Sequence, residues 1–177
     1  MKNTLNLLIA LLLFASCSSN DLDRETALKL IKEEKLYPKV IDQEIYTGDP
    51  VHARKVLETG LEKSGYVTVQ RTRKIMEIGK PIISFTDKAK PYLLPQTQED
   101  IESGVWRVKI ADEVLEEVTG IQLLEGGKNA VVEYKTAYKN ITPFSKLARF
   151  SLADNNIQKT HFSLYEDGWR MENKSVR

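Results

Sequence analysis

The fold is decided by residues 118–138, which read VTGIQLLEGGKNAVVEYKTAY. Two apolar and β-branched runs, 118–124 and 130–138, flank the segment Gly126-Gly127-Lys128-Asn129. Glycine and asparagine adopt the positive φ angles that tight turns between antiparallel strands require. The stretch therefore predicts a two-stranded hairpin, and its neighbours along the chain decide how large a sheet it joins.

Further strands are expected on both sides of this hairpin. Apolar and basic residues alternate over 106–110, which is the pattern of a half-buried strand. Residues 160–171 predict a last hairpin around Asp167-Gly168. The region 105–177 therefore predicts an antiparallel sheet of about five strands with one face covered. Its end, FSLYEDGWRM at 162–171, resembles the final hairpin of small cystatin-like and nuclear-transport-factor-like domains.

The N-terminal half predicts helices. Asp23 is a suitable N-cap for a first helix, which Pro38 ends, and a short extended segment is expected at 40–46. A second helix begins at Asp49-Pro50, where a capping side chain precedes a proline at the first helical position, and it stops at Gly65. Two strands are expected after it, at 66–72 and 81–85.

Part of this N-terminal half resembles a winged-helix domain. Leu57 and the segment 61–67 look like the end of a recognition helix that runs into the first wing strand, and ISFTDKAK at 83–90 looks like the second wing strand and its turn. The resemblance implies DNA binding. However, the whole chain carries 26 basic and 25 acidic side chains, which excludes a strongly basic nucleic-acid binder, and we expect no nucleic-acid partner.

The first sixteen residues, MKNTLNLLIALLLFAS, have the layout of a secretory signal peptide. Lys2 supplies the positive charge, and residues 7–15 form an unbroken apolar run. As a helix this run is about 14 Å long, against the roughly 30 Å of a bilayer core. It is therefore too short for a membrane-spanning anchor.

The residues at the end of this segment, Phe14-Ala15-Ser16-Cys17, resemble the lipobox of bacterial outer-membrane lipoproteins. The resemblance implies cleavage before Cys17 and acylation of that cysteine, which would attach the protein to the membrane. Ser18 stands where an aspartate would favour the inner membrane, so the resemblance implies the outer membrane, with either leaflet open. The alternatives are a plain secretory signal with a chance cysteine and a buried apolar helix.

The chain is thus expected to be an α+β protein, with a helical, winged-helix-like part followed by an antiparallel β part. Its expected segments are a lipoprotein signal peptide (1–16), a lipidated tether (17–23), the helical region (24–93), a linker (94–104) and the β region (105–177). Removing 16 of the 177 residues leaves 161, enough for an apolar core without a disulfide. Cys17 is the one cysteine, which also excludes a cysteine-based zinc finger.

Basic residues are concentrated in one part of the chain, because residues 51–92 contain nine Lys and Arg against four Asp and Glu. This excess predicts a patch for an anionic envelope partner, such as an acidic protein surface or a glycan. The alternative is a solvated basic face. The candidate patch residues are Arg54, Lys55, Arg71, Arg73 and Lys74.

No motif in the sequence predicts a catalytic, metal or cofactor site. His52 and His161 lack ligand spacing, and neither a nucleophile elbow nor a glycine-rich phosphate loop is present. An acidic run could serve glycoside hydrolysis or simply be solvated; it comprises Asp112, Glu113, Glu116 and Glu117. Strand aromatics could stack on sugars or fill a core; they are Trp106, Trp169, Tyr134, Tyr138 and Tyr165.

Three functions follow as hypotheses. The first is a non-catalytic, lipid-anchored envelope protein that binds or assembles with an envelope protein or a glycan. The second is a small envelope enzyme that processes glycan with carboxylates. The third is a cytoplasmic winged-helix DNA-binding protein, which requires that the N-terminus is not a signal.

Overall fold

The computed structural model describes residues 21–72, 79–153 and 155–172. The predicted signal peptide 1–16 and Cys17 lie outside the described residues, as does most of the tether. In chain order the elements are α1 (Arg24–Glu33), β1 (Lys39–Tyr46), α2 (Pro50–Glu58), β2 (Val67–Val69), β3 (Ile83–Phe85), the 3₁₀ helix η2 (Asp87–Tyr92), α3 (Gln98–Glu102), β4 (Val105–Leu123), β5 (Asn129–Lys139), the 3₁₀ helix η3 (Pro143–Leu147), β6 (Asn156–Tyr165) and β7 (Gly168–Glu172).

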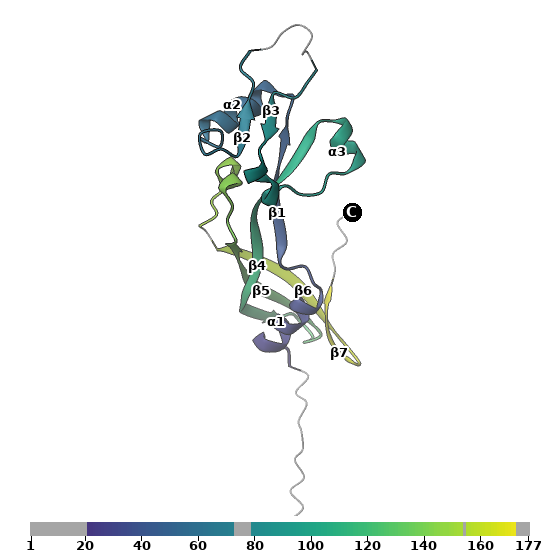
Figure 1. Cartoon of the computed structure of the whole chain (residues 1–177). Coiled ribbons are helices and arrows are strands. Elements are labelled where there is room, and N and C mark those ends of the chain that lie inside the picture. Colours follow the sequence, from purple (N-terminus) through teal and green to yellow (C-terminus); the bar gives the residue numbers. More distant parts are fainter. Residues whose placement is uncertain (1–20, 73–78, 154, 173–177) are drawn as a thin grey trace, which may run out of the picture.

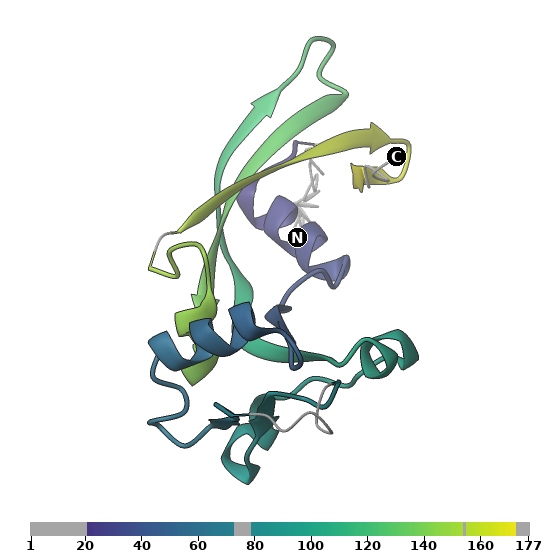
Figure 2. The same ribbon diagram turned by 90° about the horizontal axis from the view of Figure 1, so that it is seen from above.

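These elements confirm the α+β class. The strands β1, β4, β5, β6 and β7 form one antiparallel sheet in the order β1-β4-β5-β6-β7, and β2 pairs with β3 in a small second sheet. The large sheet is strongly curved, and α1 lies on its inner side (Figures 1 and 2). The hairpin predicted at 118–138 is confirmed, with Leu123 opposite Ala130 and both Gly126 and Gly127 at positive φ.

The long strand β4 organises the molecule. Its 19 residues pair with β1 along the first half and with β5 along the second. The register shifts between Leu115 and Glu117 and again between Val118 and Gly120. Such bulges bend a strand and increase its twist, which is why one strand can serve both ends of the molecule. The sequence predicted two shorter strands here, separated by the acidic run.

β1 ties the N-terminal half to the main sheet. It pairs with β4 from Lys39 opposite Glu113 to Tyr46 opposite Val105. The segment predicted as a linker, 94–104, contains α3, whose capping box joins Thr97 and Asp100. The chain just before α3 lies alongside β4, since Leu94 N donates to Arg107 O at 2.9 Å.

Two apolar clusters lie at opposite ends of β4. The α1 cluster packs α1 against the second half of the sheet and consists of Leu22, Ala27, Ile31, Val118, Ala130, Val132, Tyr134, Phe162 and Trp169. The α2 cluster packs α2, the β2–β3 hairpin and η3 against the first half and consists of Ile45, Ala53, Val56, Leu61, Val67, Val69, Ile83, Ala89, Val108, Ile110, Ala111, Phe144 and Leu147. Figures 1 and 2 both place α1 and α2 in different halves of the molecule.

Both expected helices begin where the sequence places them. The side chain of Asp23 accepts from Thr26 N at 2.7 Å, and that of Asp49 accepts from Val51 N at 2.7 Å. Each bond satisfies a backbone donor that the helix start leaves unpaired. The second helix ends earlier than expected, at Glu58 instead of near Gly65. Gly60, with φ of 73°, is the first left-handed residue beyond it.

A buried polar pair separates the two clusters on the inner face of the sheet. Along β5, Tyr134 belongs to the α1 cluster and Tyr138 packs against the α2 cluster. Thr136 lies between them, and its hydroxyl donates to Glu113 Oε1 at 2.6 Å. Both side chains are buried. Since residues two apart on a strand share a face, this pair marks where the two apolar cores meet.

Candidate functional site

The strongest candidate site is a hollow of about 420 Å³ at the α2 end of the molecule. Its walls come from α2 and from the strand segments around β2 and β3. The lining residues are Pro50, Ala53, Arg54, Leu57, Val69, Gln70, Arg71 and Ile82. Four of them, Ala53, Leu57, Val69 and Ile82, are buried or half-buried apolar residues, which we call the apolar floor, and the exposed Arg54 and Arg71 add two guanidinium groups. Such a hollow suits a partner that presents an apolar group beside an anionic one.

Arg71 is held in place by Glu62. Arg71 Nη2 lies 2.5 Å from Glu62 Oε2, and Glu62 Oε1 accepts from Val69 N at 2.9 Å. The Val69 amide and then the Arg71 guanidinium hold the pKa of Glu62 below its usual range. The carboxylate thus connects the segment after α2 to β2 and fixes the side of the hollow that Arg71 forms.

Arg54 is held more loosely. Its Nε lies 3.8 Å from Glu58 Oε1, one helical turn away, and both side chains are exposed. An exposed pair at this spacing contributes little to stability. Arg54 can therefore exchange Glu58 for an anionic group of a partner at small cost.

The pKa of Glu62 gives a testable pH dependence. Because folding lowers this pKa, the ionised carboxylate stabilises the fold at neutral pH, and that contribution is lost as pH falls from about 5 to below the lowered pKa. We expect Glu62→Gln to lower Tm at neutral pH and to have a smaller effect near pH 3, because the ionised fraction of the carboxylate falls as the pH falls. Thermal unfolding followed by circular dichroism at both pH values measures this.

The matched control is Glu58→Gln, which removes the same charge from the exposed pair with Arg54. It is expected to leave Tm nearly unchanged at both pH values. A Tm difference for Glu62→Gln that persists undiminished in acid would show that shape, and not charge, accounts for the role of Glu62.

The structure separates Lys55, another predicted patch residue, from this hollow. Lys55 does not line the hollow, because its Nζ donates to Leu147 O at 2.7 Å. Partial burial, with a smaller effect of Arg149, lowers the pKa of Lys55. Arg73 and Lys74 lie outside the described residues. Of the five predicted patch residues, the structure therefore brings Arg54 and Arg71 together and places Lys55 elsewhere.

The strand aromatics do not form one surface. Tyr134 and Trp169 are buried in the α1 cluster, and Tyr138 is half-buried against Phe150. Tyr165 is exposed at the end of β6. Trp106 lies 5.5 Å from Phe85, centroid to centroid, and lines a separate hollow of about 320 Å³. Most of these rings therefore serve packing.

The four carboxylates of the acidic run are engaged in pairs along the sheet. Asp112 accepts from Lys109 Nζ at 2.7 Å and from Asn140 Nδ2 at 2.8 Å, and these bonds lower its pKa. Glu113 is bonded to Thr136 as described above. The other two acids pair across β4 and β5: Glu116 with Lys139 and Glu117 with Lys135.

Sequence reasoning missed a second group of acids. Glu44, Glu99 and Asp100 line one hollow of about 230 Å³ together with Arg107. Hydrogen bonds from Thr97, chiefly from its backbone amide, lower the pKa of Asp100, and Arg107 adds to this effect. An acid held in its ionised form serves as a cap and ion-pair partner, and not as a proton donor. No sequence motif connects these three positions.

The histidines lie in separate places. His52 Nδ1 accepts from Tyr46 N at 3.0 Å, and His161 lies on β6. Within residues 21–72, 79–153 and 155–172, no group of three His, Cys, Asp or Glu is arranged to hold a metal ion. Over the same residues, no helix has the length and apolar character to cross a membrane.

Comparison with protein-family models, with curated proteins and with solved structures finds no match for this chain. The candidate site therefore rests on its own geometry. One sequence signal points to the hollow in retrospect: Ala53 and Leu57 are four residues apart on α2, and both line the hollow while also packing in or against the α2 cluster.

Proposed function

We propose that this chain is a non-catalytic lipoprotein of the cell envelope, anchored in the outer membrane through acylated Cys17. Leu22, which is buried in the α1 cluster, lies five positions after Cys17. Fully extended, these span at most about 18 Å. Such a tether would hold the α1 end near the lipid, and the α2 end would project away from it.

The observation that carries the binding function is the hollow at the α2 end, with its apolar floor between Arg54 and Arg71. Protein interfaces place apolar contacts at their centre and are enriched in arginine. We therefore propose that the α2 end binds an envelope partner, a protein or a glycan, that offers an anionic group next to an apolar one. The excess of basic residues over 51–92 supports a partner with an anionic group.

The winged-helix resemblance concerns only the order of α2, β2 and β3 along the chain. α2 is followed by the β2–β3 hairpin, as a recognition helix is followed by its wing. Arg54 and Arg71 each have a glutamate partner beside them, which weakens the attraction for a run of phosphates. DNA binding would become the function of this part only if the N-terminus were not a signal.

A photoreactive amino acid at Gln70, which lines the hollow, tests this function in intact host cells. We expect a discrete cross-linked product whose yield falls about tenfold when Arg54→Glu is added, since losing a charge-assisted contact costs about 1.4 kcal/mol or more. The matched control is Lys29→Glu, because Lys29 and Glu33 form a similar exposed pair on α1 at 3.9 Å.

Both changes place a glutamate four residues before another one, and Lys29→Glu adds a second such pair with Glu25, so the control imposes at least as much repulsion on its own helix. A product that is equally abundant with Arg54→Glu, or a product formed from a probe at Lys29 and absent with the probe at Gln70, would contradict binding at the α2 end.

A further inference from the structure

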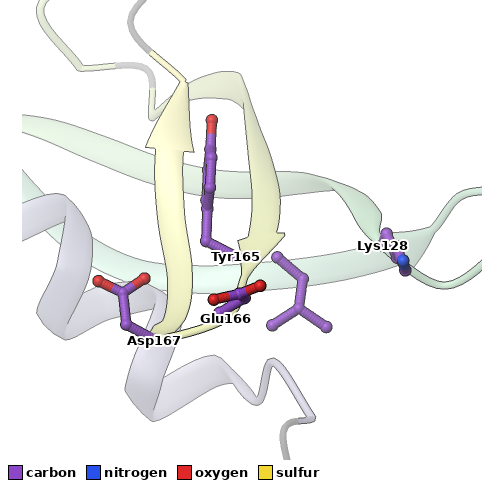
Figure 3. A pocket seen from close by; sticks show the side chains of 5 residues that line it. Lys128, Tyr165, Glu166 and Asp167 are labelled. Carbon is purple, nitrogen blue, oxygen red and sulfur yellow. The ribbon is translucent and has the colours of Figure 1, made fainter.

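The loops at the α1 end expose apolar side chains. In the β4–β5 connection, Leu123 is 54% and Leu124 is 36% exposed. The turn between β6 and β7 stands beside this connection, and the two border an open hollow of about 700 Å³ (Figure 3). It is lined by Lys128, Leu164, Tyr165, Glu166 and Asp167. We call residues 123–128 the hairpin tip.

Hydrogen bonds fix the hairpin tip against its neighbours. Leu164 N donates to Lys128 O at 2.8 Å, and Leu124 N donates to Asn129 O at 2.8 Å. The Ser163 hydroxyl also contacts the Asn129 side chain at 2.9 Å. Leu123 and Leu124 therefore belong to a hydrogen-bonded hairpin. They remain exposed although Ala130, which pairs with Leu123, is buried in the α1 cluster.

The tether enters the molecule at this same end. Leu22 packs in the α1 cluster with Ala130 and Phe162, which lie on the strands beside the hairpin tip. The start of α1 and the β6–β7 turn lie at one end of the molecule, opposite α2 (Figure 1). A lipid attached to Cys17 would be at most about 18 Å from Leu22 along the chain.

We infer that the hairpin tip is a membrane-contacting surface, in which Leu123 and Leu124 enter the interfacial region of the bilayer that holds the acyl chains of Cys17. The inference rests on the proposed function and adds an orientation to it. The short tether brings the bilayer within reach of this end, and exposed leucines beside a polar loop are the side chains that favour that region.

The charges at this end indicate that the contact is apolar. Within the tip, Glu125 and Lys128 balance each other. In the neighbouring turn, Asp167 forms an ion pair with Arg170, and Glu166 adds one negative charge. Since no basic excess attracts anionic headgroups, the contact should be insensitive to salt, unlike a contact made by a polybasic segment.

A single fluorescent label tests this surface on the full, acylated protein. Because acylation occupies the one native cysteine, Leu124→Cys provides a unique site for an environment-sensitive dye. Val51→Cys is the control, since Val51 is an apolar residue at the α2 end and is 58% exposed. Both labelled proteins are placed in phospholipid vesicles that carry a quencher at the depth of the interfacial region.

We expect the quencher to reduce the fluorescence at position 124 several-fold more than at position 51, and high salt to leave this difference unchanged. Acylated protein whose label at 124 is quenched no more than the label at 51 would overturn the membrane-contacting surface. A label at 124 that becomes shielded with rising protein density, without lipid quenching, would also overturn it and identify a second copy of the chain as the occupant. A mass spectrum without acyl groups would instead contradict the proposed function itself.

Discussion

Replacing Phe144 with alanine is expected to lower the free energy of unfolding by about 3–5 kcal/mol. Phe144 is fully buried in the α2 cluster. Its ring centroid lies 5.7 Å from that of Tyr66, 6.2 Å from Phe85 and 6.0 Å from Tyr92. The change would leave a cavity where η3, the β2–β3 hairpin and η2 meet, and a rigid core fills such a space only partly.

Urea unfolding of the two proteins measures this loss. The control is Phe150→Ala, because Phe150 is 49% exposed and packs on Tyr138 alone among the aromatic rings described. Its expected cost is below about 1 kcal/mol. Since β4 runs through both clusters, the two clusters should unfold together, and Phe144→Ala should shift this single unfolding transition to lower urea concentration. Equal losses for the two variants would contradict the assignment of Phe144 to the core.

Replacing Cys17 with serine is expected to release the protein from the membrane, provided that residues 1–16 are exchanged for a cleavable secretory leader. In the proposed anchor the acyl chains would account for the attachment, because each buried methylene contributes about 0.8 kcal/mol and two or more chains make detachment negligible. Without them, nearly all of the protein should appear in the soluble part of the envelope. Membrane fractionation followed by immunoblotting measures the distribution.

The serine variant with the native residues 1–16 is the informative companion. Because the lipobox reaction requires the cysteine, this variant should accumulate as the uncleaved, longer precursor. Its intact mass would exceed that of the acyl-free chain 17–177 by the mass of residues 1–16. If the serine variant were cleaved and retained on the membrane like the native protein, lipidation at Cys17 would be contradicted.

The local elements of this fold could be predicted because their signals lie within a few residues. The hairpin turn at Gly126-Gly127 and the helix starts at Asp23 and Asp49 all depend on short-range chemistry. The pairing of β1 with β4 could not be predicted, because it joins Lys39 to a residue far along the chain, Glu113, and no local pattern specifies that partner.

The acidic run was hard to interpret for a related reason. Asp112 and Glu113 are buried in the middle of β4 because Lys109, Asn140 and Thr136 satisfy their oxygens. In the sequence alone, four acids within six residues indicate a solvent-exposed face. Their partners become neighbours only after the sheet has formed.

The candidate site was predicted in composition and not in geometry. The basic excess over 51–92 is a property of the sequence, but Arg54 and Lys55 are adjacent and therefore point about 100° apart around α2. One joins the hollow and the other reaches Leu147 O. The apolar floor between the two arginines arises from α2, Val69 and Ile82, which come together only in the folded chain.

The most direct test of the proposed anchor is the intact mass and N-terminal analysis of the protein extracted from the membrane fraction of its host. The anchor predicts a chain that begins at Cys17, with the mass of residues 17–177 increased by its acyl groups. An unmodified chain that begins at Met1 and is recovered from the soluble fraction would contradict the anchor, the orientation and the membrane-contacting surface together.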